Sequence, residues 1–294
     1  MQSFSRGWQF LKQAWQMASA DKDLIKPSIY TLFAGAVVSV VGIIPIVIAQ
    51  MLFSNSGFGQ ITLYLGGALL VFLNFIVSYI FSAMTVYLIY GYLSEGDGRM
   101  DKAWVIVKRD LLDLATLAAA STAVNALQKL VKGQGQKAGR NFLASLIKNL
   151  WTEASYLILP AMVIEDINLT DGIKRATQIV QDNLLLVGIS TVGVKAVTGL
   201  IGFGLGLMGL VFGGALGYGI IYLAGGTTVT LGLVIGITLG LLVFFIFTMV
   251  ATVIGTYTST AYHTCLYLWA CDMEKSEVFD QTVTAPAPLA AVLE

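Results

Sequence analysis

Two long stretches of this chain contain almost no charged side chains, and they restrict its fold more than any other feature. Residues 27–94 contain no Asp, Glu, Lys or Arg, and residues 183–271 contain only Lys195. Only 12% of the 294 residues are charged, against about 25% in an ordinary soluble domain. A run of about 20 apolar residues crosses a bilayer as one helix. The sequence therefore predicts an all-α, polytopic membrane protein in contact with the lipid bilayer and excludes a water-soluble enzyme.

The counts of chemically active residue types limit the reactions and ligands to be expected. The 17 basic and 17 acidic residues balance, so no overall charge attracts nucleic acid. The single histidine, His263, and the two cysteines, Cys265 and Cys271, do not have the spacing of a standard metal site. Paired carboxylates or nucleophile–base pairs, which an intramembrane enzyme needs, are not evident. We therefore predict no enzymatic activity, no catalytic residue, no metal and no cofactor.

The first residues of the chain have the pattern of an amphipathic helix. Phe4, Trp8, Leu11 and Trp15 fall on one helical face. Such a helix lies in the membrane interface, with its Trp rings at headgroup depth. A cytosolic helix packed on the rest of the protein fits the same pattern.

The chain divides into three predicted units. Residues 1–27 are the interfacial helix, and residues 28–281 form a single helical membrane domain. Residues 282–294 contain Pro286 and Pro288 among small residues and are predicted to be a disordered tail.

Charge asymmetry around the first apolar hairpin predicts the orientation in the membrane. Residues 28–53 and 61–93 are apolar and are joined by an uncharged turn. Arg99, Lys102, Lys108 and Arg109 follow the second apolar run. Cytoplasmic loops carry the excess of Lys and Arg. We therefore expect a multi-pass protein of the cell (inner) membrane with both termini in the cytoplasm.

Two regions leave the number of crossings open. Residues 110–164 fit either a second hairpin or a surface segment followed by a short re-entrant piece. Residues 184–225 and 229–271 are each either one long helix that projects beyond the bilayer or a pair of shorter segments. A polar connection over 165–182 contains an apolar helical stripe and predicts another interfacial helix.

Glycines are concentrated in the last apolar region, where two sets recur at a spacing of four. This spacing places each set on one helix face, where small residues let neighbouring helix backbones approach closely. The hypothesis is a glycine-zipper type of helix packing within the chain, with an oligomer interface or a lipid groove as alternatives. The six residues are Gly209, Gly213, Gly217, Gly232, Gly236 and Gly240.

Glu153 and Lys195 are charged residues within stretches predicted to lie in the membrane. Glu153 precedes Glu165 by twelve positions and Lys195 follows Asn183 by twelve. At 1.5 Å per residue, two antiparallel helices would place both charges about 18 Å from the same membrane surface. Charges inside a bilayer normally face a partner or a cavity. We predict that the two residues form an ion pair, either to fix helix register or to serve transport.

Several short motifs resemble one known family when taken in order. They are Asp-Lys-Asp-Leu-Ile-Lys-Pro at 21–27, Tyr-Leu-Ile-Leu-Pro-Ala-Met-Val-Ile-Glu at 156–165, Gly-Ile-Lys-Arg-Ala-Thr at 172–177 and Leu-Tyr-Leu-Trp-Ala at 266–270. They resemble a prokaryotic family of six-helix integral membrane proteins of unknown function and, more distantly, the membrane domain of some glycerophosphodiester phosphodiesterases. The resemblance implies about six transmembrane helices and no particular activity. Its most distinctive shared residues, Pro160 and Glu165, predict a shaped helix exit.

Two classes of function fit these observations. The first is a non-enzymatic scaffold or accessory subunit that holds a membrane protein partner or a second copy of the chain through interfacial helices and glycine faces. The second is a carrier or channel for a lipid or small molecule, with Glu153 and Lys195 near its site. A water-filled cavity that reaches Glu153 or Lys195 would favour the second class, whereas a dry, closed pair would favour a structural role.

Overall fold

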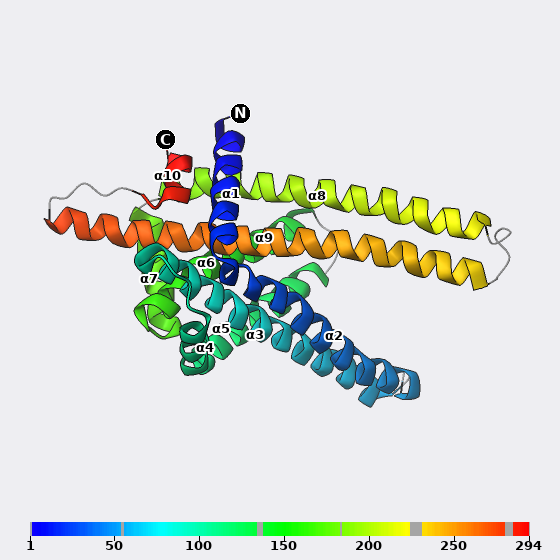
Figure 1. Cartoon of the computed structure of the whole chain (residues 1–294). Coiled ribbons are helices and arrows are strands. Elements are labelled where there is room, and N and C mark those ends of the chain that lie inside the picture. The colour runs from blue at the N-terminus through cyan, green and yellow to red at the C-terminus, as the bar shows by residue number, and fades with distance from the viewer. Residues whose placement is uncertain are drawn as a thin grey trace.

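The computed structural model describes residues 2–53, 56–133, 138–182, 184–223, 231–279 and 285–293, and these residues form helices without any strand (Figure 1). The predicted all-α class is confirmed for this part of the chain. Eight of the helices are α1 (Gln2–Ala20), α2 (Lys26–Phe53), α3 (Gly57–Glu95), α4 (Met100–Arg109), α5 (Leu111–Gly133), α6 (Ala138–Glu165), α7 (Leu169–Asp182) and α8 (Leu184–Leu223). They are followed by α9 (Leu231–Phe279) and α10 (Ala287–Leu293), and a short 3-10 turn, η1 (Lys22–Leu24), links α1 to α2.

Two long helical hairpins share one end and separate towards the other (Figure 1). In one hairpin α2 packs along α3, and in the other α8 packs along α9. We call the shared end the base, because α1, α4, α7 and α10 gather there, and the two separated ends the tips. The main hydrophobic core lies in the base, where α3 contributes Met84 and Leu88 and α9 contributes Tyr257 and Tyr262. The hairpins are therefore held together mainly at one end.

Large apolar side chains are exposed along the hairpins between the base and the tips. They occur over residues 29–53 of α2, 58–73 of α3, 200–223 of α8 and 234–250 of α9. We call these four segments the apolar belt. The segment on α8 spans about 36 Å at 1.5 Å per residue, close to the thickness of a bilayer core. Exposed Leu, Ile, Val and Phe at this density are expected to face lipid rather than water.

Four described helical segments, not six, are long and apolar enough to cross a membrane: Lys22–Phe53, Gly57–Glu95, Gly193–Leu223 and Gly232–Lys275. The count of six relied on residues 110–164, which fold as the paired helices α5 and α6. Charged residues such as Asp113, Lys148 and Glu153 reduce the hydropathy of that pair. The hairpin geometry expected there is present, but the pair lacks the composition of two spans.

The glycine-rich apolar region forms two uninterrupted helices, α8 and α9, within the described residues. With 40 residues in α8 and 49 in α9, the helices are about 60 and 74 Å long, roughly twice the thickness of a bilayer core. The alternative of one long projecting helix per segment therefore describes the fold, and the residues nearest the base extend beyond the apolar belt.

The N-terminal helix packs against the base. Phe10 and Ala14 are fully buried, Leu11 is nearly so, and Trp8 is exposed. A Cβ atom on Gly7 would lie 2.4 Å from the carbonyl oxygen of Gly193, so the backbones of α1 and α8 touch at this crossing. The arrangement matches the alternative of a helix packed on the rest of the protein.

The C-terminal segment differs from the expected disordered tail over 282–294. Residues 287–293 form α10, which contacts α1 and buries Leu289 completely. Pro286 precedes the helix, and its carbonyl accepts a hydrogen bond from the Leu289 backbone amide (2.8 Å). Proline fits the start of a helix because its missing N–H would have no partner there.

Four of the predicted packing glycines face one another across the α8–α9 hairpin. A Cβ on Gly213 would lie 2.4 Å from the oxygen of Gly240, and one on Gly217 would lie 2.8 Å from that of Gly236. Gly209 lies against Phe244 and Phe247 of α9, while Gly232, near the tip, is half-buried. The glycines at this interface pack within the chain, as small residues do between membrane helices.

Candidate functional site

Glu153 of α6 and Lys195 of α8 are brought together by the fold, and the ammonium of Lys195 donates a hydrogen bond to the carboxylate of Glu153. A third residue, His263 of α9, completes the cluster with its Nε2 atom 3.5 Å from Glu153 Oε2. The side chain of His263 is only 4% exposed, whereas those of Glu153 and Lys195 are 30% and 48% exposed. The pair is therefore partly accessible on one side and abuts a buried imidazole on the other.

The hydrogen bonding of His263 leaves one of its ring nitrogens unsatisfied. Nδ1 lies 2.7 Å from the carbonyl oxygen of Ser259. Because a carbonyl can only accept, we assign the ring proton to Nδ1, which makes Nε2 an acceptor in the neutral imidazole. Nε2 is buried without a hydrogen-bond partner, and a carboxylate 3.5 Å away cannot donate to it. A donor group is needed to satisfy this nitrogen, since buried polar atoms are normally paired.

A cavity of about 660 Å³ opens beside this cluster, between α6 and α7. Its wall is mostly apolar, with Leu157 and Ile158 from α6 and Ile173, Ala176 and Val180 from α7. The three α7 residues belong to the apolar stripe that the sequence indicated. Glu153, Lys195 and His263 supply the charged and imidazole groups of the lining. The cavity has the size and mixed lining that are typical of small-molecule sites.

The depth of the charged cluster in the membrane stays a prediction. Lys195 is the third residue of the candidate span Gly193–Leu223, and the first exposed large apolar residue that follows it on α8 is Leu200. The expectation of an ion pair about 18 Å inside the bilayer depends on the side chains of residues 184–192, which lie outside those that the structure describes. A partly hydrated position would reduce the cost of the two charges.

We expect Glu153→Gln to destabilise the protein more than the double variant Glu153→Gln/Lys195→Met does. Glu153→Gln alone leaves Lys195 without its carboxylate partner, whereas the double variant removes both charges. Because both side chains are partly exposed, the expected interaction free energy between Glu153 and Lys195 in this double-mutant cycle is about 1 kcal/mol. Thermal unfolding of the wild type, both single variants and the double variant in the same detergent measures it. Strictly additive effects would show that the two charges do not interact.

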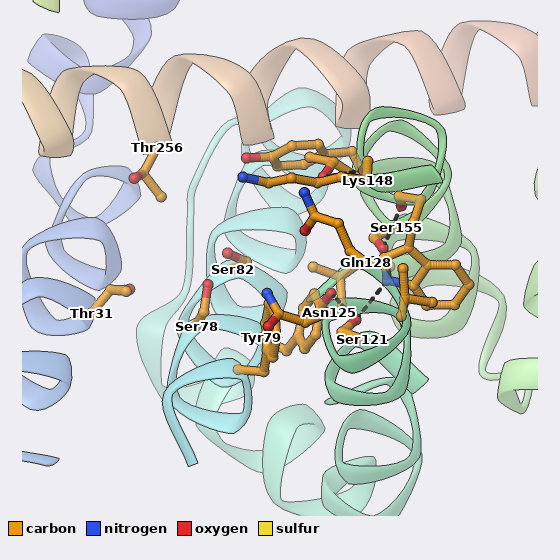
Figure 2. Close-up of a pocket in the computed structure, with 16 residues that line it drawn as sticks. Thr31, Ser78, Tyr79, Ser82, Ser121, Asn125, Gln128, Lys148, Ser155 and Thr256 are labelled. Atoms are coloured by element: carbon orange, nitrogen blue, oxygen red, sulfur yellow. Dashed lines mark hydrogen bonds between the residues drawn. The ribbon is translucent and has the colours of Figure 1, made fainter. Parts of the chain in front are cut away.

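A second cavity, of about 240 Å³, lies between α2, α3, α5, α6 and α9 and is lined largely by polar side chains (Figure 2). Ser121 is central to its hydrogen bonding, with Tyr79 Oη 2.6 Å from its hydroxyl and Trp151 Nε1 donating to it at 2.8 Å. Asn125, Gln128 and Lys148 also line this space. Sequence analysis missed the site because its residues are spread over five helices; the recurrence of Ser, Thr and Asn in otherwise apolar segments was its only signal.

The two cavities flank opposite faces of α6. Lys148, Thr152, Ser155 and Leu159 line the polar cavity, and their spacing places them on one helical face. Residues 150, 153, 154 and 157 line the apolar cavity and lie on the other face. Between the cavities the ring of Tyr156 stacks on His263, with centroids 4.6 Å apart. The same helix thus presents a polar surface to one cavity and an apolar surface to the other.

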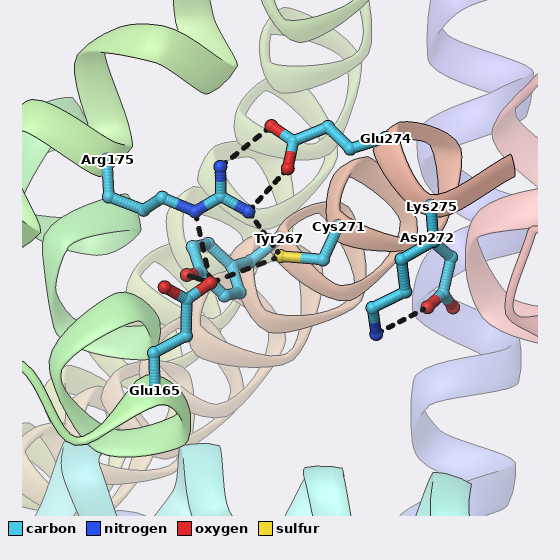
Figure 3. A network of polar contacts seen from close by, with 7 residues as sticks. All are labelled: Glu165, Arg175, Tyr267, Cys271, Asp272, Glu274 and Lys275. Atoms are coloured by element: carbon cyan, nitrogen blue, oxygen red, sulfur yellow. Dashed lines mark hydrogen bonds and ion pairs between the residues drawn. The ribbon is translucent and has the colours of Figure 1, made fainter. Parts of the chain in front are cut away.

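A polar network at the base joins α7 to α6 and α9 (Figure 3). Arg175 donates from Nη1 and Nη2 to the two carboxylate oxygens of Glu274, at 2.7 and 2.6 Å. Its Nε donates to Glu165 at 3.0 Å, and Tyr267 donates its hydroxyl to the same Glu165 oxygen at 2.6 Å. The hydrogen bonds to Glu274 raise the pKa of the Arg175 guanidinium. The network fixes α7, which forms one wall of the apolar cavity.

The predicted helix exit at Pro160 and Glu165 has a defined geometry. Pro160 is buried one turn before α6 ends at Glu165. Asp166 then adopts a left-handed backbone conformation with φ 55°. Its carboxylate forms an ion pair with Arg109 of α4 at 2.9 Å. The sequence located the exit, but not the partners of Glu165, which lie 10 and 102 positions along the chain.

The cysteines and the histidine do not combine into a metal site. Cys265 is buried as a free thiol, and Cys271 lies beside Arg175 and Glu165. No three His, Cys, Asp or Glu side chains converge as metal ligands would in the part of the chain that the structure describes.

Comparison of the chain with protein-family models, curated proteins and solved structures finds no match.

Proposed function

We propose that this chain is a multi-pass membrane protein that binds a single-tailed amphipathic molecule in the apolar cavity between α6 and α7. The observation that carries this proposal is the buried His263 Nε2, an unsatisfied acceptor at the wall of an otherwise mostly apolar space. A hydroxyl or amine on the bound molecule would donate to Nε2, and Glu153 would accept a second hydrogen bond. The tail would lie against Leu157, Ile173 and Val180.

The position of the cavity supports a ligand drawn from the membrane. Lys195 lies at the base end of the candidate span Gly193–Leu223, so an amphipathic molecule in the adjoining leaflet would have its polar head at the depth of the cluster. The amphipathic helix α7 forms the outer wall, as an interfacial helix would. We also propose that the base lies in the cytoplasm, because cytoplasmic segments carry the excess of Lys and Arg. A further part of the proposal is that the chain belongs to the six-helix membrane protein family that its motifs resemble.

We propose a carrier rather than a scaffold, because a cavity reaches both Glu153 and Lys195. A purely structural ion pair would need only a closed contact between α6 and α8, without a cavity beside it. Binding of an amphipathic molecule involves no bond making or breaking by these residues, so the proposal includes no catalytic step.

Titration of the detergent-solubilised protein with monooleoylglycerol, a single-tailed lipid with two hydroxyls, tests the proposal. At a concentration one hundred times its dissociation constant, a ligand specific for the folded state stabilises by about 2.7 kcal/mol, so the melting temperature should rise by several degrees. The variant Ala154→Leu, which fills part of the cavity, should abolish this increase. His263→Phe should reduce it by removing the acceptor.

The matched control for Ala154→Leu is Ala119→Leu, which adds the same side chain at an exposed site on α5. It should respond to monooleoylglycerol as the wild type does. Native mass spectrometry of protein extracted gently from its membrane complements the titration. A stoichiometric protein partner together with an empty cavity would reject the proposal in favour of a scaffold.

A further inference from the structure

The polar cavity contains donors that the protein itself leaves without partners. Thr31, Thr152 and Ser155 donate to carbonyls of their own helices, and Tyr79 and Trp151 engage Ser121. The Asn125 and Gln128 amides and the Lys148 ammonium line the same space, and their side chains make no hydrogen bond or ion pair among the residues that the structure describes. Their nitrogen donors are thus available to a bound group.

Charge distinguishes this cavity from the apolar one. Lys148 is the sole charged side chain among its described lining residues, and no carboxylate is among them. The other polar groups of the wall are hydroxyls, amides and an indole (Figure 2). One cation surrounded by neutral donors favours an anion that accepts several hydrogen bonds, because each donor and the positive charge then act in the same direction.

The depth of the cavity indicates which anions are close at hand. On α3 the cavity residue Ser78 is five positions beyond Leu73, where the apolar belt ends, and on α9 Thr256 is six positions beyond Val250. These offsets correspond to about 7 to 9 Å. On α2 the cavity residue Thr31 is two positions inside the belt, which begins at Ile29, so the cavity lies at the edge of the belt on the base side, where lipid headgroups begin. Phosphate is the anionic group that lipids carry at this depth, and basic pockets between membrane helices bind such headgroups.

We infer that the polar cavity binds a phosphate group, with Lys148 as its cationic contact and Asn125 and Gln128 as hydrogen-bond donors. The phosphate is carried either by a phospholipid headgroup or by a soluble phosphate ester. A volume of about 240 Å³ accommodates the phosphate and a small polar substituent, while a lipid tail would remain outside, along the belt. This site is separate from the apolar cavity and does not depend on the function proposed for it.

Native mass spectrometry with added phosphatidylglycerol tests the lipid source, with Lys148→Met as the decisive variant. Loss of the ammonium should reduce retention of phosphatidylglycerol by about tenfold or more, since hydrogen bonds to charged groups are among the stronger ones. Lys108→Met, at an exposed lysine of α4, is the matched control and should retain the lipid as the wild type does.

Isothermal titration with inorganic phosphate tests the soluble source in the same proteins. Saturable binding that Lys148→Met abolishes, without selective lipid retention, would assign the site to a soluble phosphate ester and uphold the inference. Asn125→Leu, which removes a donor but no charge, should weaken whichever probe binds. If neither probe depends on Lys148 in variants that keep the wild-type melting temperature and helix content, the inference is overturned. If Lys148→Met does not fold, binding of both probes is measured in Asn125→Leu and Gln128→Leu. The inference is then overturned if neither variant weakens the binding of either probe.

Discussion

Replacing Arg175 by Met is expected to cost about 3 kcal/mol of stability and to lower the melting temperature by about 6 °C or more. Arg175 is 19% exposed and contacts two carboxylates, Glu165 of α6 and Glu274 of α9. Met has a similar length but no charge, so both carboxylates would remain without their guanidinium partner. Like-charge repulsion between them would then loosen α7 from the base. Thermal unfolding followed by circular dichroism measures the change.

Two further substitutions separate the geometry of this network from its charge. Arg175→Lys keeps the charge but cannot donate in a bidentate manner to Glu274 while bonding Glu165, so most of the loss should persist. Lys174→Met, at the neighbouring position, removes an exposed charge that pairs with Asp171 one turn earlier, and its effect should be within about 0.5 kcal/mol. Equal effects of Arg175→Met and Lys174→Met would contradict the role assigned to the network.

Gly213→Ala is expected to disrupt the α8–α9 hairpin at a cost of about 1 to 3 kcal/mol. The new Cβ would lie 2.4 Å from the carbonyl oxygen of Gly240, and a helix backbone cannot move aside as a flexible side chain can. The two helices would have to separate locally and lose close contact at Gly217 and Gly236 as well. A decreased melting temperature and faster proteolysis near the tip are the expected observations.

The adjacent residue provides an unusually close control. A Cβ on Gly214 would meet no atom within 4 Å, so Gly214→Ala should be neutral or stabilise the protein by up to about 1 kcal/mol through helix propensity. Both variants make the same chemical change one residue apart on α8. If Gly214→Ala destabilises the protein as much as Gly213→Ala does, the close approach of the two backbones does not explain the effect of Gly213→Ala.

The features that sequence analysis predicted are those that local patterns determine. Apolar runs gave the membrane class, the helical spacing of Ile173, Ala176 and Val180 gave the apolar face of α7, and the spacing of Gly213 and Gly217 gave a packing face. Glu153 and Lys195 could be paired because one short connection fixes their helices as antiparallel. In each of these cases the relevant partners lie on one helix or on two helices with a known direction.

The features that the sequence did not reveal depend on how distant helices meet. Arg175 and Glu274 are 99 positions apart, and nothing in the local pattern of either residue indicates the other. The polar cavity needs five helices at once, and the unsatisfied nitrogen of His263 is evident only from the position of Ser259 and Glu153. The depth of the ion pair stays a prediction for a related reason, because the length of α8 outside the bilayer depends on which of its residues the base buries.

The length of α9 has a mechanical consequence. Its 49 residues contain no proline and run without interruption from the Arg175 network through the wall of the apolar cavity to the tip. Proline is a common cause of sharp kinks in long helices, and α9 has none. A tilt of about 5° at the base would displace the far end by about 6 Å over its length. If α9 tilts as one unit, a small movement beside His263 would be enlarged at the far end of the α8–α9 hairpin.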